Sequence, residues 1–109
     1  MPEMTSLLAA AGGTSRTRLL QRVARSLGIG VDRLLSKERD RVTADKRHLA
    51  AWLLRRGHSM SYPALGRMLE RDHTSVLHAV RRVEAERAMS PELAERLEEL
   101  LDEIAKEDQ

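Results

Sequence analysis

The 109-residue chain contains no cysteine, so disulfide bonds and thiolate metal sites are excluded. It also contains no phenylalanine, and Trp52 and Tyr62 are its only aromatic residues. The core must therefore be built from leucine, valine, alanine, methionine and isoleucine, and we expect modest stability. No apolar run is long enough to span a bilayer, and the first residues lack the basic leader of a secretion signal. We expect one small cytoplasmic domain without a membrane association.

Charge is plentiful, but its sign changes along the chain. Residues 1–91 carry 17 basic and 9 acidic side chains, a net charge of +8, whereas residues 92–109 carry 2 basic and 8 acidic ones, a net charge of −6. A basic surface is the expected electrostatic footprint of a nucleic-acid-binding protein, because neutralised phosphates release counterions. The alternative is an ordinary solvated surface, since many basic domains bind no particular anion.

Residues 61–88 have the pattern of a helix-turn-helix. Ser61 can cap a helix that begins at Tyr62, with Pro63 in the first turn, where its missing N–H costs little. After a short polar interruption, Asp72 can cap a second helix, whose apolar stripe consists of Val76, Leu77, Val80 and Val83. The polar first turn of that helix suits an approach to phosphates and base edges. The same residues also fit a simple capping sequence that binds nothing.

The remaining segments predict an all-α fold, a compact helical bundle. Residues 1–13 are expected to form a flexible lead ending in Gly12 and Gly13, and residues 14–109 a single domain. A basic loop is predicted over residues 36–47, and Thr43 is predicted to cap a helix that runs to Arg56. A C-terminal helix capped by Ser90 is predicted over residues 91–106, with leucines on one face and acidic side chains on the other.

Two segments carry a family resemblance. The run Arg71-Asp72-His73-Thr74-Ser75-Val76-Leu77-His78-Ala79 closely resembles the signature of the C-terminal DNA-binding domain (domain IV) of the bacterial chromosomal replication initiator DnaA. Upstream, Leu34-Leu35-Ser36-Lys37 and the arginine-containing loop are similar to the segment that precedes this signature in the family. The resemblance covers roughly residues 17–104 and implies a Trp-repressor-like helix-turn-helix that binds double-stranded DNA.

The resemblance also implies individual roles. An arginine of the basic loop enters the minor groove in this family, and the start of the recognition helix reads bases in the major groove; the matching residues here are Arg39, Asp72, His73 and Thr74. Phosphate contacts are implied at Arg47, His48, Arg55 and Ser75, and at the backbone near Tyr62 and Pro63. The loop departs from the family pattern because three acids dilute it, namely Glu38, Asp40 and Asp45, and each acid opposes phosphate.

Enzymatic and metal-dependent functions are not expected. The chain has no G-x-x-x-x-G-K-[ST] loop, so the AAA+ ATPase of DnaA is missing and no nucleotide or other cofactor is expected. Asp72, His73 and Ser75 are too close in sequence to form a catalytic triad. His73 and His78 are five residues apart and point in different directions on a helix, so they do not form a metal pair.

We therefore expect a freestanding, sequence-specific reader of DnaA-box-like sites that modulates replication initiation or transcription at the bacterial nucleoid. One alternative is a protein-interaction adaptor of the replication machinery, which would bind a replication-initiation partner through the acidic C-terminal helix and have weak or no specific DNA binding. Another is an origin-binding protein of a phage or mobile element. A reader of one short asymmetric site can work as a monomer, and the sequence also leaves open a dimer made through the final helix.

Overall fold

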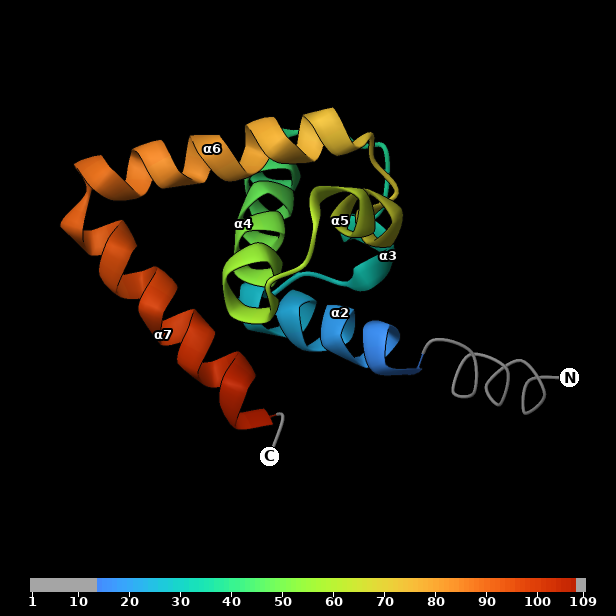
Figure 1. Ribbon diagram of the computed structural model, residues 1–109, viewed down its shortest axis with the longest axis horizontal. Helices are drawn as coiled ribbons and strands as arrows, with labels where there is room; N and C mark the ends of the chain where they lie inside the picture. Colours follow the sequence, from blue (N-terminus) through green and yellow to red (C-terminus); the bar gives the residue numbers. More distant parts are fainter. Residues whose placement is uncertain (1–13, 108–109) are drawn as a thin grey trace, which may run out of the picture.

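The computed structural model describes residues 14–107, and these residues form helices and no strand, which confirms the all-α class. The predicted flexible lead, residues 1–13, lies outside the described residues. Figure 1 shows the arrangement of the helices, which are α2 (Thr14–Leu27), α3 (Val31–Leu34), α4 (Arg41–His58), α5 (Tyr62–Leu69), α6 (His73–Met89) and α7 (Pro91–Glu107). Within the described range, no helix has the length and apolar character needed to cross a membrane.

Helix α4 is the centre of the bundle and packs against each of the other described helices. Five consecutive residues of α4, from Ala50 to Leu54, are buried, so this part of the helix is covered on every side. Helices α6 and α7 form a V in Figure 1, with α4 between its arms. Because α4 is surrounded, it fixes the positions of the helix-turn-helix and of α7 relative to each other.

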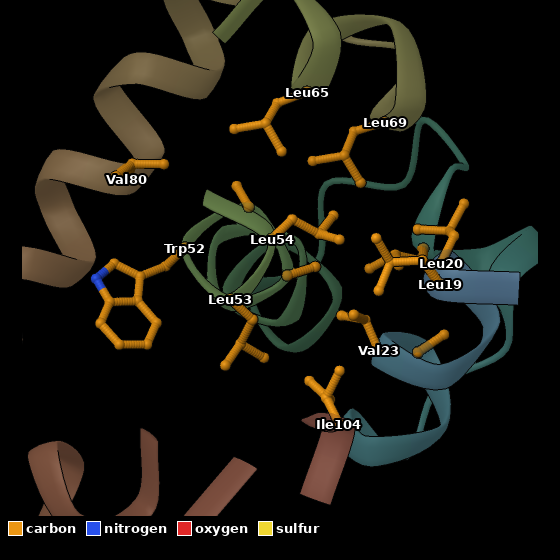
Figure 2. Close-up of a cluster of buried hydrophobic side chains, with 14 of the residues drawn as sticks. Leu19, Leu20, Val23, Trp52, Leu53, Leu54, Leu65, Leu69, Val80 and Ile104 are labelled. Carbon is orange, nitrogen blue, oxygen red and sulfur yellow. The ribbon is translucent and has the colours of Figure 1, made fainter. Parts of the chain in front are cut away.

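The core is aliphatic, as the scarcity of aromatic residues predicts. Figure 2 shows leucine and valine side chains from α2, α4, α5 and α6 converging, with Ile104 of α7 closing one side. Burying a leucine or valine side chain contributes about 1.5–3 kcal/mol, so stability is distributed over many small contributions. Trp52 is the exception in size; it is buried, and its indole N–H donates to the carboxylate of Glu84 at 2.7 Å.

Three predicted helix starts are confirmed. The Ser61 hydroxyl accepts from the N–H of Ala64 at 3.2 Å, and the Asp72 carboxylate accepts from the N–H of Thr74 at 3.0 Å. The Ser90 hydroxyl accepts from the N–H of Leu93 at 3.2 Å at the start of α7. These caps satisfy backbone donors that have no partner inside the helix.

The predicted start of α4 is wrong. Asp40 is the N-cap, and its carboxylate accepts from both the N–H and the hydroxyl of Thr43 at 3.0 Å. Thr43 lies inside the helix and is fully buried. The predicted basic loop, residues 36–47, is therefore helical from Arg41 onward, and the non-helical connection is shorter than expected.

Candidate nucleic-acid interface

The turn between α5 and α6 is tight because Gly66 has no side chain. A Cβ atom at Gly66 would lie 2.7 Å from the carbonyl oxygen of Arg71 and 3.3 Å from the backbone nitrogen of His73. Glu70 ends α5 in the left-handed conformation, with φ of 55°, and the Arg71 N–H donates to the Gly66 carbonyl at 2.9 Å. The close approach fixes where α6 begins.

The predicted base-reading residues of α6 are brought together at its free first turn. Asp72, His73, Thr74 and Ser75 are exposed, whereas Val76 turns into the core. One Asp72 carboxylate oxygen caps the helix, and the other lies 4.0 Å from Nδ1 of His73. The capping oxygen holds the carboxylate in place, so the second oxygen is presented to solvent in a fixed orientation.

The loop that carries Arg39 lies beside this turn. Loop and turn together line an open hollow of about 450 Å³, formed by Lys37, Glu38, Arg39, Ala44, Arg47, Glu70, Arg71 and Asp72. Arg39 is exposed. The fold thus places the predicted minor-groove arginine and the first predicted major-groove residue on the same hollow, although they are far apart in the sequence.

Two of the loop acids have structural partners. Arg33 lies 3.3 Å from the carboxylate of Glu38 and 3.5 Å from that of Asp40, and it also donates to the Thr43 hydroxyl at 3.0 Å. The hydrogen bonds from the backbone and hydroxyl of Thr43 lower the pKa of Asp40, and the charge of Arg33 lowers it further. Asp40 is thus a helix cap, and the nearby Arg33 charge opposes the negative charge of both acids.

Arg47 is occupied by the loop itself. Its guanidinium donates to the carbonyls of Leu34 at 3.0 Å, Ser36 at 2.9 Å and Glu38 at 3.4 Å. Burial lowers the pKa of Arg47, and the nearby charge of Arg71 lowers it further. Arg47 therefore organises the loop backbone, while the phosphate contact implied by the resemblance stays a prediction.

The other predicted phosphate residues line separate hollows along the same elements. The guanidinium of Arg55 stacks on the ring of Tyr62, with its carbon 4.4 Å from the ring centroid, and donates to the Met60 carbonyl at 2.7 Å. His48 and Ser75 line a hollow of about 200 Å³ between α4 and α6. Pro63 lines another, of about 450 Å³, together with Asp72 and His73.

Several basic residues at these hollows were not singled out from the sequence. Arg56 and Arg81 line the hollow of Arg55 and Tyr62, and Arg67 lines that of Pro63 and His73. Arg71 belongs to the signature run, but the resemblance implies no role for it. The position of Arg67 one helical turn after Pro63 is the one sequence signal that could have indicated it.

Comparisons with known proteins match the chain to a single family. A family model described as "Bacterial dnaA protein helix-turn-helix" matches residues 17–83. The chromosomal replication initiator protein DnaA of Caulobacter sp. (strain K31) is 50% identical over 66 residues, which make up 60% of this chain and 14% of that protein. The protein of the same name from Agrobacterium fabrum is 40% identical over 86 residues, covering 75% and 18%. That of Brucella abortus is 38% identical over 100 residues, covering 88% and 20%. The chain thus spans no more than a fifth of the length of these relatives.

Proposed function

Because the chain belongs to the bacterial DnaA helix-turn-helix family, we propose that it binds double-stranded DNA in a sequence-specific manner, at DnaA-box-like sites. The observation that carries the proposal is the shared hollow of Arg39 and Asp72, which sets a loop arginine beside the exposed start of α6. An α-helix fits the major groove, and an arginine fits the adjacent narrow minor groove. The two features together match a reader of both grooves.

In this proposal the first turn of α6 enters the major groove. The free oxygen of Asp72 accepts a hydrogen bond from a base amino group, such as that of cytosine. His73 supplies a ring nitrogen to a base edge, and Thr74 supplies a hydroxyl and a methyl group that can contact a thymine methyl. Arg39 enters the minor groove. These contacts carry the sequence information.

Phosphate contacts set the register of the protein on the duplex. At the start of α5, Ser61 accepts from the N–H of Ala64, and Pro63 has no N–H. The Tyr62 N–H has no acceptor inside the helix and is available to a phosphate at the positive end of the helix dipole. Arg55, stacked on the Tyr62 ring, adds a full positive charge at the same place. His48 and Ser75 provide a second phosphate contact between α4 and α6.

The proposed role is to modulate replication initiation or transcription at the nucleoid. The family match lies in the helix-turn-helix, and the chain has no G-x-x-x-x-G-K-[ST] loop. Occupation of a site is enough to compete with another protein for the same site.

Binding to a labelled duplex that contains a DnaA box, compared with a scrambled duplex across a salt series, tests the proposal. We expect a preference for the box that persists as salt rises, with a log–log slope of about −0.9 per phosphate contact. The double variant His73→Ala, Thr74→Ala should lose that preference, because each good base contact contributes about 1–3 kcal/mol. Arg55→Ala is the matched control and should weaken binding to both duplexes by the same factor. Equal affinity of the unmodified chain for the two duplexes would refute the proposal.

A second candidate is a protein-interaction adaptor of the replication machinery. It is favoured by the exposed outer face of α7, which carries Glu95, Glu98, Glu99, Asp102 and Glu103. Part of this charge is used internally, since Glu98 lies 3.6 Å from Arg87 and Glu99 lies 3.5 Å from Arg96. The adaptor proposal requires that box and scrambled duplexes bind equally, so the same experiment separates the two functions.

A further inference from the structure

The carbonyl oxygen of Ser36 accepts hydrogen bonds from two guanidinium groups. Arg47 reaches it from α4 at 2.9 Å, and Arg71 reaches it from the turn of the helix-turn-helix. Arg71 also donates to the carbonyl of Glu70 at 3.0 Å, beside its own backbone. The side chain of Arg71 therefore joins two segments whose contacting residues are 35 positions apart in sequence.

Both joined segments carry proposed base contacts. Ser36 opens the loop that presents Arg39, and Arg71 immediately precedes Asp72, the cap of α6. Arg71 and Arg39 line the same hollow. A movement of the loop relative to the turn would change the distance between the minor-groove arginine and the major-groove residues, and the hydrogen bond from Arg71 opposes that movement.

The arrangement has an electrostatic cost. Arg47 and Arg71 are like charges, and repulsion between them opposes their convergence on one oxygen. The carbonyls of Leu34, Ser36 and Glu38 compensate by accepting from Arg47 in a half-buried position. Hydrogen bonds from charged donors are stronger than neutral ones, and the planar fork of arginine holds its acceptors in a fixed geometry.

We propose that Arg71 is a positioning residue for DNA recognition, which sets the spacing between Arg39 and the first turn of α6 through its hydrogen bond to Ser36. The inference rests on the proposed function. A pre-set spacing lets one duplex satisfy the minor-groove and major-groove contacts together, without a cost of ordering the loop at the moment of binding. The competing role for Arg71 is a direct phosphate contact.

A double-mutant cycle on the full chain distinguishes these roles. The affinity for the DnaA-box duplex is measured for Arg39→Ala alone, combined with Arg71→Met, and combined with Arg67→Met. Arg67→Met is the matched control, because it removes the same charge from the exposed face of α5 nearby. Loss of a base contact lowers affinity for the DnaA-box duplex about tenfold. If Arg71 positions Arg39, the loss of affinity caused by Arg39→Ala shrinks to less than about threefold in the Arg71→Met background, because the effects of coupled residues are not additive. It stays about tenfold in the Arg67→Met background.

Additive losses in the Arg71→Met background would overturn the inference, while the box preference of the unmodified chain would still stand. Absence of that preference in the unmodified chain would overturn the proposed function and this inference together. Amide hydrogen exchange of residues 37–39 in the free protein gives a readout that does not involve DNA. Exchange should accelerate in Arg71→Met, and unchanged exchange would also overturn the inference. If Arg71→Met does not fold, Arg71→Gln takes its place in the cycle.

Discussion

Replacing Gly66 by alanine should separate the geometry of the turn from helix propensity. Gly66 lies inside α5, where alanine is normally preferred to glycine by about 1 kcal/mol. The new Cβ would lie 2.7 Å from the Arg71 carbonyl oxygen, about 0.7 Å inside ordinary van der Waals contact at 3.4 Å. The obstacle is backbone, so it cannot rotate away.

The two effects oppose each other, and the clash should be the larger. Overpacking costs about 1–3 kcal/mol and occasionally more, and here the strain falls on the segment that sets the Asp72 cap. We expect Gly66→Ala to destabilise the protein by up to about 2 kcal/mol after the gain in propensity. For a domain of this size the thermal midpoint would fall by about 4–8 °C per kcal/mol. Affinity for a DnaA-box duplex should fall as well, because α6 and Arg71 are displaced.

Gly57→Ala is the matched control. Gly57 also lies in a helix, but its added Cβ would meet only the terminal methyl of Leu101, at 3.2 Å, which can move by a few tenths of an ångström. We expect this variant to be as stable as the unmodified chain or more stable. Urea denaturation of both variants, followed by circular dichroism, makes the comparison. A Gly66→Ala variant as stable as Gly57→Ala would refute the argument that the turn requires glycine.

Two further predictions concern single side chains. Burial, followed by the charge of Arg82, lowers the pKa of His48 below 6.5, so the folded state binds this proton less tightly than the unfolded state. The contribution of His48 to stability should therefore be fully present above pH 6.5 and be lost as the pH drops through the folded pKa. Urea titrations of the unmodified chain and of His48→Gln should give different pH dependences of stability in that window. Parallel plots of stability against pH for the two proteins would contradict this. Trp52→Phe removes the donor to Glu84 and should cost about 1–3 kcal/mol, measured by thermal unfolding; an unchanged midpoint would show that the 2.7 Å hydrogen bond contributes nothing net.

Local patterns predicted much of the fold. Ser61, Asp72 and Ser90 each precede an apolar stripe at helical spacing, and each is a cap in the structure. The failure at Thr43 has a physical reason. Asp40 and Thr43 are both good capping residues three positions apart, and the choice depends on burial of Thr43 and on Arg33, which the sequence does not place.

The candidate site was predictable as a set of residue types, but its internal connections were not. The family resemblance predicts that Arg39 and Asp72 both contact bases, and the fold brings both residues to one hollow. The hydrogen bonds of Arg47 and Arg71 to Ser36 depend on how the loop folds back against the turn, and no local periodicity encodes that contact. The sequence also does not encode the ion pairs of the loop. From the sequence alone, Glu38 and Asp40 are expected only to repel phosphate, whereas in the structure both lie close to Arg33.

The packing of α7 against α2 and α4 bears on the order of folding. Ile104 lies beside Val23 of α2 in Figure 2, so the first and last described helices meet in the core. Contacts between α5 and α6 close a short loop of chain, whereas contacts between α2 and α7 close a long loop that contains the whole helix-turn-helix. Closing a longer loop costs more conformational entropy, so the contacts between α2 and α7 are expected to form later. The two helices proposed to read DNA can therefore pair before α2 and α7 meet, and the docking of α7 then completes the core.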